Sequence, residues 1–229
     1  MTGDIGLGAL EAFSAAGELP VLAVYRRAVY LSGRRGIAAL TTMAAPAGPL
    51  HLRRAAIPPC RVGERVRSDG STLRGPRWEL SLDLPAWVGS LPPPGLLPAA
   101  TLPIARIAEH AARLGGRGPG LTPEGDDVLA GLLLVAAAQG SPPEGLAAIA
   151  ASVRTTAVAS AFLAWAARGQ CIAPAHDVLA ELAVHGPHAS TPACARLTAV
   201  GASSGGALLA GIRFGLQPDL EHSPATPLL

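Results

Sequence analysis

A run of three prolines and a glycine, Pro92 to Gly95, constrains the fold of this chain more than any other feature. Proline removes a backbone donor and fixes φ, so such a run continues neither a helix nor a central strand. The sequence pattern also changes here. Short runs with one alternating apolar face come before it, and long alanine- and leucine-rich stretches with helical spacing come after it. The chain therefore divides into a β-rich part and a helical part.

We predict an α+β fold, in which a small β-barrel or curled antiparallel sheet precedes an all-helical half. The expected strands are residues 21–31, 36–42, 50–55, 61–66 and 78–84, with a hairpin turn at Asp69-Gly70. The expected helices are residues 102–114, 126–139, 143–167, 175–185 and 192–216. The predicted domains are a β-rich domain over 1–90, a proline-rich linker over 91–99, a helical domain over 100–216 and a flexible tail over 217–229.

Composition excludes several classes of function. The chain has 229 residues, 49% of them hydrophobic, and a net charge of +2, with its arginines scattered along the sequence. Nucleic-acid binding is therefore not expected, because the basic stripe that it requires is missing. No apolar run reaches the roughly 20 residues of a membrane span. We see no secretory signal, and the three cysteines share no metal-ligand spacing, so we expect a cytoplasmic protein.

The segment most suggestive of chemistry is the glycine-rich stretch over residues 115–127, which leads into a helix. Thr122-Pro123-Glu124 is typical of a helix start, with a hydroxyl cap, a first-turn proline and an acid. Such a start presents unpaired N–H groups to an anion. Candidate ligand contacts in this loop are Arg117, Gly118, Gly120, Thr122 and Gly125.

Asp126 and Asp127 lie in the first turn of the same helix and are the candidate catalytic residues. Two carboxylates repel a bare anion, so we expect them to orient an amide, hold a metal ion or exchange a proton. The alternative is that these acids only complement the helix dipole and that the glycines allow close packing. No cofactor is certain, and a divalent metal bound by these acids is one option.

A second glycine-rich segment precedes the last helical stretch. Residues 205–211 (GGALLAG) align with residues 125–131 (GDDVLAG), which suggests a short internal repeat. Two helix starts behind glycine turns are able to converge on one anionic ligand, with Ser203, Ser204 and Gly205 as the contacts from the second. The alternative is a serine cap followed by a glycine that permits close helix approach.

Three hydroxyl residues in the helical half form a third candidate segment. We place Thr155, Thr156 and Ser160 inside one helix, where Thr156 and Ser160 share a face and line a pocket. Alternatively, their hydroxyls bond back to the preceding turn. The six histidines show no zinc-binding pattern, and without a lysine the chain has no P-loop.

Taken in order, residues 118–127 (GPGLTPEGDD), the Thr155, Thr156 and Ser160 set, and residues 201–211 resemble the bacterial family that contains AllH, a subunit of oxamate carbamoyltransferase. This resemblance implies a transferase subunit in ureide breakdown. Its complex would exchange oxalurate and phosphate with oxamate and carbamoyl phosphate. The implied partners are a small anionic substrate and other subunits of the complex.

Two positions depart from the family pattern. Family members commonly carry serine where this chain has Glu124 and an acid where it has Ala207. The resemblance implies that such changes alter the charge around the ligand. Two other functions stay open on the sequence: a non-catalytic partner subunit, and a metal-dependent enzyme that acts on small carboxylates.

Overall fold

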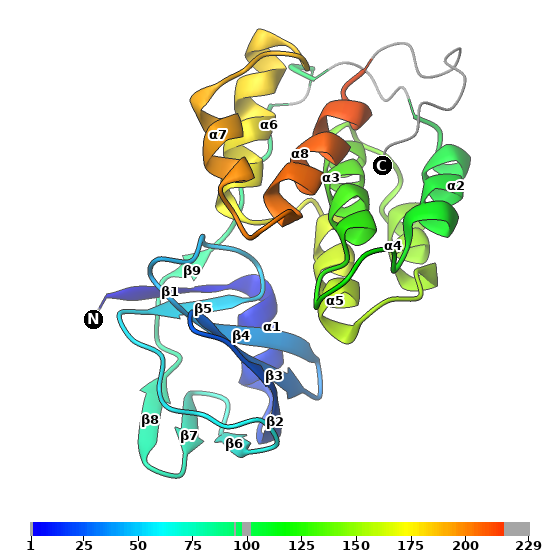
Figure 1. The fold of residues 1–229 in the computed structure, drawn as a ribbon. Coiled ribbons are helices and arrows are strands. Elements are labelled where there is room, and N and C mark those ends of the chain that lie inside the picture. The colour runs from blue at the N-terminus through cyan, green and yellow to red at the C-terminus, as the bar shows by residue number, and fades with distance from the viewer. Residues whose placement is uncertain (1, 94, 98–101, 218–229) are drawn as a thin grey trace. The chain divides into compact units, whose positions relative to one another are not determined.

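The computed structural model describes residues 2–93, 95–97 and 102–217 (Figure 1). The chain forms two compact units, Met1–Val88 and Gly89–Leu229, called the β unit and the helical unit below. The predicted extents of the domains and of a separate linker stay predictions. The predicted tail, apart from Gln217, lies outside the described residues.

The β unit is built on one nine-stranded sheet with the strand order β8-β7-β6-β2-β3-β4-β5-β1-β9. Most neighbouring strands are antiparallel, but β4 pairs with β5 and β1 pairs with β9 in parallel. The strands are β1 (Gly3–Gly6), β2 (Gly17–Val24), β3 (Ala28–Gly33), β4 (Gly36–Thr42), β5 (His51–Arg54), β6 (Arg65–Ser68), β7 (Thr72–Gly75), β8 (Trp78–Ser81) and β9 (Ala86–Trp87).

The sheet curls because β2 belongs to both of its halves. Residues 17–20 of β2 pair with β6, whereas residues 21–24 pair with β3, and the register shifts between Val21 and Ala23. Such a bulge bends a strand and increases its twist. Strands β8 and β9 lie at the two ends of the strand order and do not pair with each other, so the curled sheet is open. The predicted α+β class with a curled sheet is confirmed, although the sheet is mixed where an antiparallel one was predicted.

Helix α1 (Leu7–Ser14) covers this sheet and closes the core of the β unit. Phe13 is fully buried there among the inward-facing strand residues, which include Leu19, Leu31 and Leu73. The sequence analysis did not predict α1, because its eight residues are too few to show a helical period clearly. It also missed β1 and β9, which are short strands at one side of the sheet.

The strand predictions were correct where turn residues mark the ends. Strand β4 has the predicted limits, and the Asp69-Gly70 hairpin is confirmed by the pairing of Ser68 with Leu73. The Asp69 carboxylate accepts the N–H groups of Ser71 and Thr72, at 2.9 and 2.8 Å, and stabilises this turn. The single strand predicted over 21–31 is wrong. It is a hairpin, in which the Tyr25 N–H donates to the Ala28 carbonyl at 2.8 Å.

The helical unit packs around α3, which contacts α2, α4, α5 and α8 (Figure 1). None of the helices in the described part of the chain has the length and apolar character needed to cross a membrane. The helices are α2 (Ile104–Leu114), α3 (Glu124–Ala138), α4 (Pro143–Ser152), α5 (Ala157–Ala166), α6 (Ala173–His185), α7 (Pro192–Thr198) and α8 (Ser204–Gly215).

Two of the predicted helices are each broken into two. Residues 143–167 form α4 and α5, and residues 192–216 form α7 and α8. The first break comes before Thr156, whose hydroxyl accepts the Ala159 N–H and caps α5. The second contains Gly201, whose φ of +68° ends the helical path. Alanine- and leucine-rich sequence lies on both sides of each break, so apolar periodicity alone did not reveal the breaks.

Candidate functional site

The loop between α2 and α3 has a backbone that only glycine adopts without strain. Gly116, Gly118 and Gly120 have φ values of +70°, +118° and +96°. A Cβ on Gly116 would lie 2.5 Å from the Arg154 carbonyl oxygen, so this part of the loop also lies tightly against the chain before α5. The backbone conformation and packing of the loop therefore require glycine at these positions whether or not a ligand binds.

Asp126 fastens this loop to the break between α4 and α5. Its side chain is buried, with one carboxylate oxygen accepting the Gly116 N–H at 2.8 Å and the other accepting the Thr155 hydroxyl. The hydroxyl of the next residue, Thr156, donates to the Leu121 carbonyl. Both oxygens of Asp126 are thus engaged inside the protein, and they hold the loop in place.

Asp127, one residue further along α3, is in a different state. Its carboxyl group is half-buried, and Oδ2 is fully buried with no hydrogen-bond partner among the described residues. Burial raises the pKa of this carboxyl to about 7. A hydrogen bond from Ser204 opposes that rise, and the charges of Asp126 and Glu124 add to it. Near neutral pH Asp127 is therefore able both to donate and to accept a proton.

The amino ends of α3 and α8 converge at this carboxyl group. The Thr122 hydroxyl, just before α3, lies 3.3 Å from the hydroxyl of Ser204, the first residue of α8. The backbone N–H groups of Glu124, Ser204 and Gly206 have no acceptor within the part of the chain that the structure describes. Free N–H groups at helix starts attract an anion through their partial positive charge.

The two glycine segments occupy equivalent positions in the structure. A Cβ on Gly125 would lie 2.1 Å from the Leu114 carbonyl oxygen at the end of α2. A Cβ on Gly205 would lie 1.9 Å from the Leu197 carbonyl oxygen near the end of α7. Each glycine thus lets the start of its helix approach the helix that precedes it in the sequence.

The same equivalence holds six residues further along each helix. A Cβ on Gly131 would lie 2.4 Å from the Leu208 carbonyl oxygen, and one on Gly211 would lie 2.0 Å from that of Val128. Each glycine faces the carbonyl group of the residue that lies three positions before the glycine of the other helix. These reciprocal contacts relate residues 125–131 and 205–211 by an approximate two-fold axis. The helices that contain them, α3 and α8, lie side by side (Figure 1). The glycines of both aligned segments have the same structural role, which is to let helix backbones approach closely.

Residues 114–216 match the family model of the oxamate carbamoyltransferase subunit AllH. This part of the chain belongs to the AllH family. The AllH region begins at the last residue of α2 and ends just after α8, so it contains both glycine segments and the Thr155-Thr156 break. Neither a curated protein nor a solved structure matches the chain.

The AllH region brings only some of the predicted site residues together. Direct contacts join Thr122, Asp127 and Ser204 at the convergence of the two helices, with Gly125 and Gly205 buried beside it. Arg117, Gly118, Gly120 and Ser203 are exposed on the two loops, and the Arg117 guanidinium has no ion pair with a described residue. Their contacts with a ligand stay predictions.

The predicted position of Thr155, Thr156 and Ser160 inside one helix is wrong. Helix α5 begins at Ala157, so Thr155 lies in the break and Thr156 is the cap. The hydroxyls of both threonines are used within the protein, by Asp126 and by Leu121 with Ala159. Ser160 is half-buried in the first turn of α5. A contact of Thr156 or Ser160 with ligand stays a prediction.

Two features of the AllH region were not visible in the sequence. Thr155 is the partner of Asp126, 29 residues away in the chain. Cys171 is buried, which raises the pKa of its thiol to about 12, and the charge of Asp127 adds to this rise. No sequence pattern links Cys171 to Asp127. Across the described residues, no group of three or more His, Cys, Asp or Glu side chains is placed to hold a metal ion.

Proposed function

We propose that this chain is a subunit of an oxamate carbamoyltransferase-type complex that acts in ureide breakdown. The ligand is a small anion of the carbamoyl phosphate, oxamate or oxalurate kind. It binds where α3 and α8 converge. One observation carries this proposal: among the described residues, the N–H groups of Glu124, Ser204 and Gly206 at the starts of α3 and α8 have no backbone acceptor, and the Asp127 Oδ2 in the first turn of α3 is buried without a hydrogen-bond partner.

The backbone N–H groups suit one part of such a ligand, and the Asp127 carboxyl suits the other. Carbamoyl phosphate and oxamate both join an oxyanion to an amide-type NH₂ group. The N–H groups of Glu124, Ser204 and Gly206 donate hydrogen bonds to the oxyanion. The Asp127 carboxylate accepts a hydrogen bond from the NH₂ group, so a ligand with both parts avoids the repulsion that a bare anion would meet.

In this proposal Asp127 also exchanges the proton of the transfer step. When a phosphate oxygen attacks the ureido carbon of oxalurate, the carbon–nitrogen bond breaks and the departing oxamate nitrogen takes up a proton. A carboxylic acid with a pKa of about 7 is protonated in part of the molecules at neutral pH and supplies that proton. In the reverse direction its carboxylate removes the proton.

The remaining site residues have supporting roles in this proposal. Asp126 keeps the glycine loop in place through Gly116 and Thr155, which makes it a positioning residue. Arg117 lies exposed on the loop and contacts the phosphate group once ligand is bound. The Thr122 and Ser204 hydroxyls, 3.3 Å apart, line the site between the two helices.

A second function is favoured by the family description itself, which names a subunit. In this alternative the chain binds no small molecule, and the converging helix starts pack against another subunit. Purified alone, it would then bind none of these ligands, but it would co-purify with the other subunits. A metal-dependent enzyme has less support, because both oxygens of Asp126 already accept hydrogen bonds.

The proposal is tested by measuring how phosphate, carbamoyl phosphate, oxamate and oxalurate shift the thermal unfolding of the chain. A ligand that binds only the folded state raises the unfolding temperature. The test variant is Asp127→Asn, and each ligand shift is taken against the variant's own ligand-free midpoint. We expect Asp127→Asn to weaken binding of oxamate and carbamoyl phosphate by about tenfold or more, because a charged hydrogen-bond acceptor is lost.

Glu144→Gln is the matched control. Glu144 is also an acid in the first turn of a helix, α4, and the substitution should leave ligand binding unchanged. Saturable binding that Asp127→Asn leaves intact would remove Asp127 from the site. If none of the four ligands shifts the unfolding temperature, the partner-subunit alternative is favoured.

A further inference from the structure

The β unit contains a cavity of about 490 Å³ that is separate from the site proposed above. Two short segments form it. Pro59, Cys60, Arg61 and Glu64 come from the loop between β5 and β6. Pro76 and Arg77 come from the turn between β7 and β8, and Trp78 is the first residue of β8. Its size falls within the range of about 300–1,000 Å³ that is usual for small-molecule sites.

The charged side chains of this cavity favour an anion. Arg61 and Arg77 line it from opposite segments, against a single carboxylate, that of Glu64. Neither guanidinium forms an ion pair with any residue that the structure describes. By contrast, Arg65 and Arg74 on the neighbouring strands β6 and β7 are both paired, with Glu18 and with Asp69 and Glu79. The cavity lining therefore carries a positive net charge, from two arginines without an ion pair to a described residue against one glutamate.

The position of the glutamate is fixed by the loop itself. One Glu64 carboxylate oxygen accepts the backbone N–H of Arg61 at 2.8 Å, and the Glu64 N–H donates to the Arg61 carbonyl at 3.0 Å. These bonds close the loop and hold the Arg61 backbone beside the cavity. The second carboxylate oxygen of Glu64 is available to accept a hydrogen bond from a donor group on a ligand.

Trp78 supplies a rigid apolar wall. Its indole packs directly on Gly75, where a Cβ would lie 2.2 Å from the ring nitrogen. That ring nitrogen, Nε1, is buried and has no hydrogen-bond partner among the described residues. A flat ring held in this way gives a planar surface on which an unsaturated or planar group packs well.

The cysteine in the lining does not bring thiolate chemistry to the cavity. Burial raises the pKa of the Cys60 thiol to about 11, and the Glu64 charge adds to that rise. Near neutral pH the thiol is therefore protonated, and it acts as a neutral part of the wall. This leaves the two arginines as the groups that recognise a ligand.

We propose that this cavity binds a small molecule bearing a carboxylate or phosphate group, held by the guanidinium groups of Arg61 and Arg77 and packed against Trp78. Planar guanidinium groups bind both oxyanions through paired hydrogen bonds, which accounts for two arginines in one cavity. The site is independent of Asp127 and lies in the part of the chain outside the AllH region.

The test follows Trp78 fluorescence during titration with inorganic phosphate and with succinate, at constant ionic strength set with chloride. The two probes separate phosphate recognition from carboxylate recognition. We expect saturable binding of at least one probe, and a loss of the signal in Trp78→Phe. Arg61→Gln and Arg77→Gln should each weaken binding by about tenfold or more, because each removes a charged hydrogen-bond donor.

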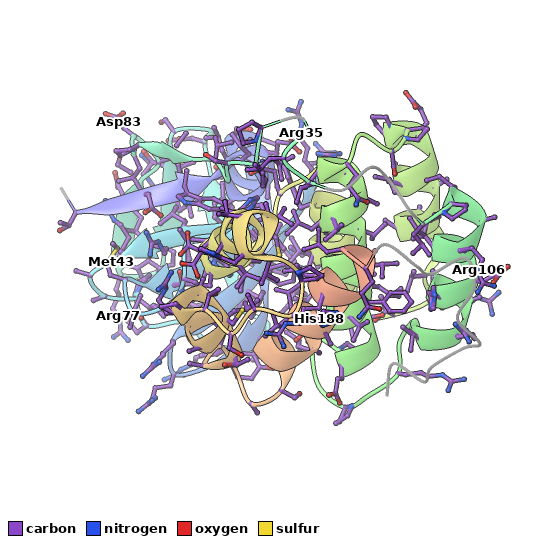
Figure 2. The ribbon with its side chains drawn as sticks, turned by 90° about the horizontal axis from the view of Figure 1, so that it is seen from above. Arg35, Met43, Arg77, Asp83, Arg106 and His188 are labelled. Carbon is purple, nitrogen blue, oxygen red and sulfur yellow. The ribbon has the colours of Figure 1, made fainter. Side chains whose placement is uncertain are left out.

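Arg35→Gln is the matched control. Arg35 is an exposed arginine of the same unit that does not line the cavity, and Figure 2 shows it well apart from Arg77. This variant and Asp127→Asn should both leave the Trp78 signal unchanged, which keeps the result separate from binding at the helical site. The proposal would be overturned if neither probe gave a saturable signal. It would also be overturned if Arg61→Gln and Arg77→Gln bound the probes with the same affinity as the unmodified chain.

Discussion

Gly131 and Gly211 face each other where α3 crosses α8. A Cβ added to Gly211 would lie 3.2 Å from the Gly131 Cα and 2.0 Å from the Val128 carbonyl oxygen. The reciprocal Cβ on Gly131 would lie 2.4 Å from the Leu208 carbonyl oxygen. The two helices are therefore in backbone contact, and this contact sets how closely their amino ends approach each other around Asp127.

The first prediction concerns this crossing. Gly211→Ala should destabilise the protein by about 1–3 kcal/mol or more, because the added methyl group overlaps backbone atoms that belong to another helix. For a chain of this size each kcal/mol corresponds to about 2–4 °C in the unfolding midpoint. The measurement is urea unfolding followed by circular dichroism, together with thermal unfolding.

Gly206→Ala is a control within the same helix. A Cβ at Gly206 would have nothing within 4 Å, so alanine there should stabilise α8 by about 0.5–1 kcal/mol through its higher helix propensity. If Gly211→Ala proved as stable as the unmodified chain, the close crossing of α3 and α8 would be refuted.

The second prediction follows from the raised pKa of Asp127. An unperturbed aspartate titrates near 3.8, whereas Asp127 in the folded protein titrates at about 7. Between these values the folded state keeps a proton that the unfolded chain has lost. Unfolding then releases a proton, so the Asp127 contribution to stability decreases as the pH rises from about 4 to about 7. Outside this window both states have the same protonation, and the contribution is constant.

Asp127→Asn should remove this dependence, because asparagine does not titrate. The free energy of unfolding of Asp127→Asn, minus that of the unmodified chain, should grow with pH across the window and level off above about pH 7. The other titrating groups are common to both proteins and cancel in the difference. Urea unfolding at a series of pH values measures it, and a difference that stays constant from pH 4 to pH 8 would contradict the raised pKa.

The sequence predicted the class of the fold because the two halves differ in hydrophobic period and in turn residues. The limits of β4 and the Asp69-Gly70 hairpin follow from local turn chemistry, which a sequence contains directly. The helix breaks at Thr156 and Gly201 were missed, since a hydroxyl cap is recognised only once its N–H partner is known. The parallel pairing of β4 with β5 depends on contacts that no local pattern specifies.

The candidate site was predictable to a similar degree. The glycines and the helix start located the loop, and the alignment of residues 125–131 with 205–211 indicated that two helix starts converge. The partners that Asp126 and Asp127 each meet were not predictable. Adjacent residues on a helix point about 100° apart, and only the tertiary packing decides that one carboxyl meets Gly116 and Thr155 while the other meets Ser204.

The third prediction uses the approximate two-fold axis between α3 and α8. Because Gly125 corresponds to Gly205, Glu124 corresponds to Ser204 and Asp127 corresponds to Ala207. Ser204 donates a hydrogen bond to the Asp127 carboxyl. The same symmetry brings Ala207, which is 5% exposed, close to Glu124. An aspartate at 207 would then place a second buried carboxyl beside the Glu124 carboxylate, and like charges at short range repel.

Ala207→Asp alone should therefore destabilise the protein, and Glu124→Ser should relieve part of that cost by supplying a hydroxyl where Ser204 supplies one to Asp127. A double-mutant cycle of urea unfolding at pH 8 should give a favourable coupling of about 0.5–3 kcal/mol between the two substitutions. Glu144→Ser, at the start of α4, provides a control pair with Ala207→Asp that should be additive. Additivity of Glu124→Ser with Ala207→Asp, within about 0.5 kcal/mol, would show that the symmetry does not extend to these side chains.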